Sequence, residues 1–149
     1  MTTPQGSNLK PSLTRDEVDA LIRGAFPDGE GGPVAGEVVE VGPGLVRLQL
    51  DPVAAMGRPG GIVSGPTQMA MADHAAYAVV LAHIGPALMA VTHTLTMNFL
   101  RACRMERIYA DAQLLKLGRR LATIDVRLWQ GSPDQIVAQA TVGYTLPAD

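Results

Sequence analysis

The spacing of apolar residues changes along the chain, and each change predicts a new kind of element. The first apolar segment has helical spacing and comprises Val18, Leu21, Ile22 and Phe26. Thr14 precedes it and Glu17 follows three positions later, which is the pattern of a capping box. We expect a short helix here that ends at residues 27–29 and leads into a glycine-rich turn at residues 30–33.

From residue 34 the apolar spacing shifts to two, the period of a β-strand. Residues 34–41 and 45–50 are two such segments, and the sequence between them is Gly-Pro-Gly. A tight turn between two alternating segments predicts an antiparallel hairpin. Residues 51–65, which are rich in glycine and proline, are predicted to form a loop.

A long apolar segment at residues 66–84 then interrupts the strands. Pro66 suits the first position of a helix, where its missing N–H costs nothing, and Gly85 and Pro86 end the segment. Apolar residues occupy almost every face, so we expect a helix that is buried on most sides.

Four more strands are predicted after this helix, at residues 91–99, 108–117, 121–129 and 136–146. Strands that follow one another without alternating helices indicate an α+β fold with an antiparallel sheet. We therefore predict a sheet of about six strands wrapped round one long buried helix, with a short N-terminal helix outside it. Residues 14–149 are predicted to form a single domain, and residues 1–13 a flexible N-terminal arm.

Composition narrows the classes of protein. The chain has 149 residues with a net charge of −2, which argues against a nucleic-acid partner. Charged residues make up 17%, below the usual ~25%, and this favours an oligomer that hides surface. One cysteine, Cys103, permits neither an internal disulfide nor a zinc-type spacing. We find no signal-like segment and no membrane-length apolar run, so a cytoplasmic protein is expected. From the lack of zinc-type spacing we also expect no metal.

Asp73 is the one carboxylate in the long apolar helix, and it is the first candidate for chemistry. In an apolar site it could act as a nucleophile or general base, or it could be a buried structural aspartate. Gly65 lies at the start of the helix, where its N–H could hold a developing negative charge. Tyr77 and Met69 lie at helical spacing from Asp73 and could line a substrate pocket, or simply pack in the core.

His93 falls on the apolar face of strand 91–99, the face expected to meet the long helix, where it is either a core residue or part of the site. Lys116, Arg119 and Arg120, with Arg101 nearby, form the only compact cationic cluster in the sequence. Guanidinium groups suit phosphate, although a solvated hairpin tip is an equal alternative.

Three short motifs resemble one known family. They are Ser64-Gly65-Pro66 followed by Met71-Ala72-Asp73, then Asn98-Phe99-Leu100-Arg101, and finally Gly118-Arg119-Arg120. In this order they resemble the hotdog-fold acyl-CoA thioesterases of the phenylacetic-acid-degradation (PaaI) type. In that family a His-Gly-Gly precedes the helix and an acidic residue follows nine positions after the histidine. Ser64 stands at the histidine position, Pro66 at the second glycine, and Arg58 near the position of an upstream amide.

The resemblance implies hydrolysis of a medium-chain or aromatic acyl-CoA, with coenzyme A as part of the substrate and no separate cofactor. It implies Asp73 as nucleophile or general base, Gly65 as the amide that polarises the carbonyl, and Ser64 as the third catalytic position. It further implies a site shared between the subunits of a homodimer or dimer of dimers. The candidate substrate-binding residues are Arg58, Gly61, Met69, Tyr77, His93, Asn98, Arg101, Lys116, Arg119 and Arg120.

Two other functions stay open. The departures at Ser64, Pro66 and Arg58 are compatible with a noncatalytic protein that binds acyl-CoA or an acyl carrier. A hydratase of the same fold is a weaker alternative, because the sequence lacks a convincing histidine and acid pair.

Overall fold

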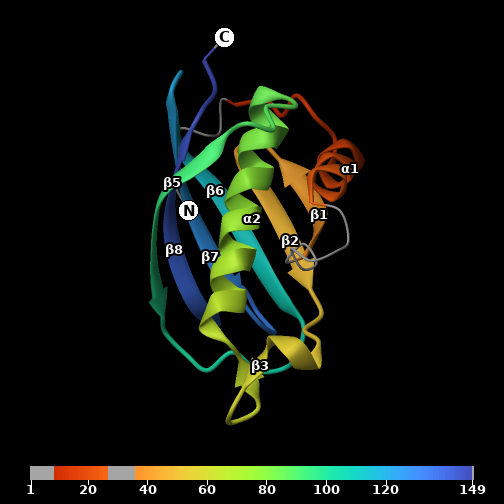
Figure 1. Ribbon diagram of the computed structural model, residues 1–149, viewed down its shortest axis with the longest axis vertical. Coiled ribbons are helices and arrows are strands. Elements are labelled where there is room, and N and C mark those ends of the chain that lie inside the picture. Colours follow the sequence, from red (N-terminus) through yellow and green to blue (C-terminus); the bar gives the residue numbers. More distant parts are fainter. Residues whose placement is uncertain (1–8, 27–35, 149) are drawn as a thin grey trace.

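A curved antiparallel sheet wraps round one long helix in the computed structural model, which describes residues 9–26 and 36–148 (Figure 1). The main helices and strands are α1 (Arg15–Ala25), β1 (Glu37–Gly42), β2 (Leu45–Leu50), α2 (Gly65–Ile84), β5 (Val91–Phe99), β6 (Ile108–Leu117), β7 (Leu121–Trp129) and β8 (Ile136–Thr145). The six-stranded sheet has the order β1-β2-β6-β7-β8-β5, and α2 packs against every strand of it. The predicted α+β hotdog architecture is confirmed.

Helix α1 begins as its capping box predicts. The Thr14 hydroxyl accepts from the Glu17 N–H at 3.2 Å, and the Glu17 carboxylate accepts from the Thr14 N–H at 2.9 Å. The predicted end at residues 27–29 and the turn after it lie outside the described residues. Val18 and Ile22 are buried against the core, and Phe26 at the C-cap stays 42% exposed.

Part of the predicted N-terminal arm is docked on α2. The backbone N–H groups of Ser12 and Leu13 both donate to the Ala82 carbonyl, at 2.7 and 3.2 Å. Leu9 and Leu13 pack against the core cluster. Residues 9–13 are therefore held at the C-terminal end of α2, whereas residues 1–8 lie outside the described part of the chain.

Helix α2 begins one residue earlier than predicted, with Ser64 as its N-cap and Pro66 at its second position. Residues 75–82 are each at most 4% exposed, which confirms the expected burial of this helix. It ends at Gly85, whose φ of 93° lies in the left-handed region that favours glycine. Among the described residues, no helix is long and apolar enough to span a membrane.

His83 fixes the C-terminal end of α2 to the turn between β1 and β2. Its Nε2 accepts from the Gly44 N–H at 2.8 Å, and its Nδ1 lies 2.8 Å from the Val79 carbonyl. Only a neutral imidazole with its proton on Nδ1 satisfies both contacts. Burial lowers the pKa of His83, which agrees with this neutral form.

The loop predicted at residues 51–65 is more ordered than expected. It contains a 3-10 turn (Ala54–Met56) and a small hairpin of β3 (Gly57–Arg58) and β4 (Ile62–Val63). The Ser64 N–H donates to the Met56 carbonyl at 2.8 Å. This hairpin therefore fixes the direction in which the chain enters α2.

Strand β5 departs from the strict alternation that the sequence predicts. Thr92 pairs with Tyr144 and Thr94 pairs with Gly143, so His93 is the extra residue of a β-bulge. A Cβ on Gly143 would lie 2.6 Å from His93 Nε2, which means that the imidazole covers Gly143 on the outer face of the sheet. The predicted orientation of His93 toward α2 is wrong, because the bulge reverses the facing of the residues before it.

Candidate active site

The side chain of Asp73 lies where α2, β5 and β8 meet. Its Oδ1 accepts a hydrogen bond from the Thr92 hydroxyl of β5 at 2.6 Å and another from the Tyr144 hydroxyl of β8 at 2.8 Å. No hydrogen bond to Oδ2 is found among the described residues. Asp73 is partly buried, and in the described part of the chain only one of its carboxylate oxygens is held, by two neutral donors.

Tyr144 is a rigid donor to this carboxylate. It is only 2% exposed, and its ring stacks on that of Tyr77 with centroids 5.9 Å apart. Its hydroxyl also lies 3.2 Å from the Asp73 backbone carbonyl. Burial and the negative charge of Asp73 both raise the pKa of Tyr144, so its phenol keeps the proton that it donates.

A row of aromatic rings continues from Tyr144 across α2 to α1. The Tyr77 hydroxyl donates to the Leu88 carbonyl at 2.9 Å, and its ring meets Phe26 edge-on at 5.9 Å. Phe26 also contacts His74 at 5.1 Å. Burial lowers the pKa of His74 even though the charge of Asp73 opposes the shift, which favours a neutral imidazole beside the carboxylate.

The N-terminal end of α2 holds the other two catalytic candidates. The Ser64 hydroxyl donates to Thr67 Oγ1 at 2.9 Å and accepts from the Thr67 N–H at 3.3 Å, so it is occupied as a helix cap. Gly65 follows it, and within the described residues its N–H has no acceptor. The ring of Phe99 lies 3.5 Å from where a Cβ of Gly65 would be, so this amide sits beside β5.

Asp73 and Gly65 do not meet within one chain. They are eight positions apart on the same helix, which at 1.5 Å per residue separates them by about 12 Å along the axis. An amide that polarises a carbonyl must lie about 3 Å from the carbonyl oxygen. A base or nucleophile must lie about as close to the atom on which it acts. One chain alone therefore cannot apply its Gly65 amide and its own Asp73 to the same carbonyl.

The remaining candidates on α2, on β5 and just after β5 do not converge on Asp73. Met69, one turn before Asp73, is 43% exposed. The Asn98 side chain donates to Gln139 at 3.4 Å and the Arg101 guanidinium donates to Gln135 at 2.7 Å, so both lie toward β8 and the turn that precedes it. Neither contacts Asp73 in these bonds, and their predicted binding roles stay predictions.

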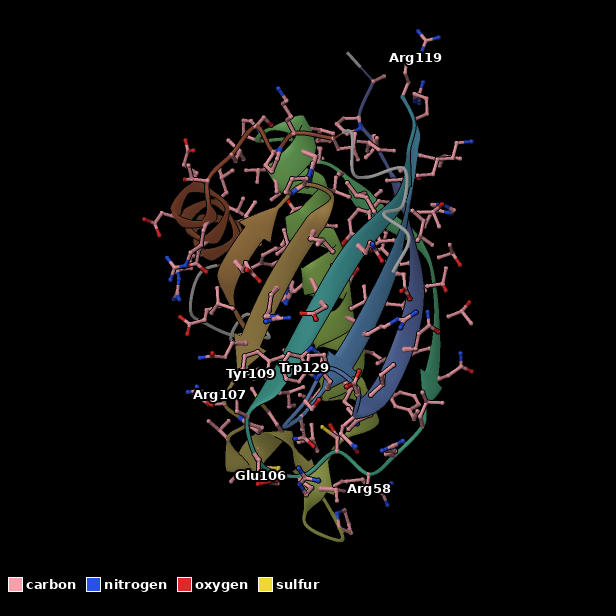
Figure 2. All side chains as sticks on the ribbon, turned by 180° about the vertical axis from the view of Figure 1, so that it is seen from behind. Arg58, Glu106, Arg107, Tyr109, Arg119 and Trp129 are labelled. Atoms are coloured by element: carbon pink, nitrogen blue, oxygen red, sulfur yellow. The ribbon has the colours of Figure 1, made fainter. Side chains whose placement is uncertain are left out.

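The basic candidates lie at two ends of the molecule. Figure 2 places Arg119 at one end, at the tip of the β6–β7 hairpin, and Arg58 at the opposite end, on the β3–β4 hairpin that also carries Gly61. Tyr144 pairs with Ala122, and the Leu146 N–H donates to the Arg120 carbonyl at 2.8 Å. The end of the sheet with Arg119 and Arg120 is thus the end nearer Tyr144.

Sequence reasoning missed Thr92 and Tyr144 as partners of Asp73. Alternation in strand 136–146 already put Tyr144 on the same face as its apolar neighbours, so the signal for this residue was present. Thr92 could not be found in this way, because the bulge at His93 is what turns it toward α2.

No site for a metal is formed by the residues described, among which no three histidine, cysteine, aspartate or glutamate side chains converge. Cys103 is buried, and burial raises the pKa of its thiol to about 11. It therefore behaves as a core residue rather than as a nucleophile.

Comparison with known proteins supplies the family. A family model described as the thioesterase superfamily matches residues 60–137, the segment that contains Gly65, Asp73 and Thr92. No functionally curated protein matches the chain. A crystal structure of a candidate thioesterase from Silicibacter sp. TM1040 is 34% identical, with a TM-score of 0.81 over 98% of this chain and 99% of that one.

Two more distant structures share the fold. A candidate thioesterase from Ralstonia eutropha JMP134, related to phenylacetic acid degradation, is 23% identical with a TM-score of 0.71, covering 84% of this chain and 98% of that one. A hypothetical thioesterase from Streptococcus pneumoniae TIGR4, crystallised with coenzyme A, is 19% identical with a TM-score of 0.67, covering 76% and 86%. The chain belongs to the thioesterase superfamily, and the prediction of a thioester hydrolase is confirmed at this level.

Proposed function

We propose that this member of the thioesterase superfamily hydrolyses medium-chain or aromatic acyl-CoA thioesters, and that Asp73 performs the chemistry. The Asp73 carboxylate carries this proposal. It is the one acid of an otherwise apolar helix, it is held by two hydroxyl donors, and it forms no ion pair among the described residues. A carboxylate that is fixed but not neutralised by a cation keeps the charge that nucleophilic or base chemistry needs.

Two routes use this carboxylate with the same overall balance. As a general base, Asp73 takes a proton from water while the water oxygen attacks the thioester carbonyl, and the proton then passes to the departing thiolate. As a nucleophile, Asp73 forms a mixed anhydride and expels the thiolate, and water then hydrolyses the anhydride. Both routes consume one water and release a carboxylic acid and coenzyme A thiol.

We further propose that the site is completed by a second copy of the chain. Gly65 and Asp73 of one chain are about 12 Å apart along α2, so the amide that polarises the carbonyl comes from the neighbouring copy. Strand β5 is an edge strand of nine residues beside Asp73, available for antiparallel pairing with its own copy. Ser64 contributes by capping the helix end that presents Gly65. A dimer of dimers is the expected assembly.

The cationic residues supply an anchor for the coenzyme A phosphates in this proposal. Lys116, Arg119 and Arg120 are near the end of the sheet where Tyr144 holds Asp73, and Arg58 of a second copy would add to them. The coenzyme A bound to the Streptococcus pneumoniae neighbour supports this class of substrate by analogy. Guanidinium groups at an exposed hairpin bind phosphate with strong dependence on salt.

A panel of acyl-CoA thioesters, assayed for release of thiol, tests the proposed function. We expect turnover of medium-chain or aromatic members by the wild type and loss of turnover in Asp73→Ala and Asp73→Asn. Turnover that survives both substitutions would contradict the role of Asp73. Binding of acyl-CoA without turnover by the wild type would instead support the noncatalytic alternative.

A further inference from the structure

The two oxygens of the Asp73 carboxylate have different surroundings. Both hydroxyl donors, Thr92 from β5 and Tyr144 from β8, reach Oδ1, at 2.6 and 2.8 Å. Oδ2 has no hydrogen-bond donor among the described residues. A freely rotating carboxylate would exchange its oxygens, but two donors from separate strands of one sheet define a single orientation.

We propose that Tyr144 is a positioning residue which, through its hydrogen bond to Oδ1, fixes the Asp73 carboxylate so that Oδ2 is the oxygen that reacts. This inference rests on the proposed function and specifies which oxygen of Asp73 reacts. Oδ1 serves as the anchor, and Oδ2 faces the water or thioester carbon.

The surroundings of Tyr144 make it suitable for this role. Its ring is 2% exposed and stacked on Tyr77, so the phenol has little freedom to follow a moving carboxylate. Its backbone pairs with Thr92 on one side and Ala122 on the other, which places it in the interior of the sheet. Thr92, in contrast, is exposed on the edge strand. Tyr144 is therefore the more rigid of the two donors.

The other charged and titratable groups around the carboxylate leave its orientation to the two hydroxyls. Among the described residues the titratable groups near Asp73 are His74 and Tyr77 on α2 and Tyr144 on β8, while His93 of β5 lies on the outer face. No lysine or arginine in the described residues forms an ion pair with Asp73. Within the described part of the chain, the hydroxyls of Thr92 and Tyr144 are thus the groups that hold its carboxylate directly.

Tyr144→Phe isolates the hydroxyl, because it keeps the ring and its stacking on Tyr77. We expect kcat to fall by about tenfold with KM changed less than twofold, since one charge-assisted hydrogen bond is lost. Tyr109→Phe, which removes a hydroxyl on the outer face of the sheet, should leave both unchanged.

A double variant with Asp73→Asn separates this role of Tyr144 from a purely structural one. If the hydroxyl acts only through Asp73, then Tyr144→Phe placed in the Asp73→Asn background should not lower the residual rate any further. A variant whose fold is merely loosened would lose rate in both backgrounds. A wild-type kcat in Tyr144→Phe would overturn the inference.

A measurement of the carboxylate that does not depend on activity separates this inference from the proposed function. Crystal structures of the wild type and of Tyr144→Phe should show the Asp73 carboxylate in one orientation in the wild type and rotated or disordered in the variant. If the wild type hydrolyses no thioester, the proposed function fails while this change still supports the positioning of Asp73 by Tyr144. An unchanged carboxylate in the variant refutes the positioning whether or not the enzyme turns over.

Discussion

Two aspartates on opposite sides of the sheet, Asp73 of α2 and Asp111 of β6, are held in different ways. On the helix side, Asp73 receives two neutral hydroxyls on Oδ1 only. On the outer face, Asp111 accepts from Arg47 through both oxygens, at 2.6 and 3.1 Å, and from the Trp129 indole at 3.0 Å. Among the described residues, the first carboxylate has one oxygen without a donor and no cation paired with it, whereas the second has both oxygens occupied.

The Asp111 cluster has the properties of a structural ion pair. Arg47 lies over the ring of Trp129 at 5.1 Å, and Trp129 stacks on Tyr109 at 4.4 Å, in the region that Figure 2 labels. The hydrogen bond from Arg47 to Asp111 raises the pKa of the guanidinium. The Asp111 carboxylate joins β2, β6 and β7 with both oxygens bonded, whereas the role proposed for Asp73 needs an oxygen that is not already bonded. The number of bonded oxygens, rather than burial alone, distinguishes the two carboxylates.

The largest expected effect comes from Asp73→Asn. The amide oxygen still accepts from Thr92 and Tyr144, so the free energy of unfolding should change by less than about 0.5 kcal/mol. Turnover should fall by about 10³-fold, because the amide is neither a base nor a nucleophile. Steady-state kinetics and urea unfolding of the same preparation check both parts. A large loss of stability would place Asp73 in the same structural class as Asp111.

The matched substitution Asp111→Asn should have the opposite effects, which are a loss of stability and little change in turnover. It removes the charge that pairs with Arg47, and since both side chains are about a third exposed the cost should be about 1–2 kcal/mol of unfolding free energy. The expected kcat stays within twofold of the wild type, because the cluster lies on the far face of the sheet. A loss of turnover comparable to that of Asp73→Asn would end the contrast between the two carboxylates.

The free energy of unfolding should also depend on pH, through two partly buried histidines. Burial lowers the pKa of His83 below its ordinary value of 6.5, so as the pH falls the unfolded chain binds the proton first. The stability that the neutral imidazole contributes is therefore present above about pH 6.5 and is lost below it. His74 shifts in the same direction. Urea unfolding at pH 5 and pH 8 should show a smaller difference in His83→Gln, and an equal difference would contradict this role.

The smallest effect is expected at Gly143, beneath the bulge that turns Thr92 toward Asp73. In Gly143→Ala the new Cβ would lie 2.6 Å from both His93 Nε2 and Thr94 Cγ2, so β5 must shift. We expect a loss of about 1 kcal/mol of unfolding free energy and a modest fall in kcat as Thr92 moves. His93→Ala in the same chain should restore part of the stability. If Gly143→Ala leaves the free energy of unfolding unchanged, the bulge does not depend on close packing.

Much of the fold could be predicted from the sequence because its patterns are local. The capping box at Thr14 and the strand alternation in residues 121–129 each depend on neighbours within a few positions, and the structure confirms them. The small hairpin in residues 51–65 could not be predicted in this way. Its two strands have two residues each, which is too short for a periodic signal.

The site was predictable only in part. Asp73 stands out because a carboxylate interrupts an apolar helix, and Ser64 and Gly65 because they precede a proline at a helix start. His93 was assigned to the wrong face, since alternation assumes that each residue of a strand has one partner. One extra residue in β5 leaves Leu95 and Met97 toward the helix but sends His93 outward and Thr92 inward.

The sequence by itself determined that one acid lies in a buried helix, and that antiparallel strands surround it. Only the tertiary structure decided what this acid touches. Tyr144 is 71 positions away from Asp73 and Thr92 is 19, and both reach the same oxygen. Periodicity reports which face a side chain occupies, but the pairing of β5 with β8 and the bulge at His93 set the register. Register, and not composition, directs both hydroxyl donors to Oδ1 of Asp73.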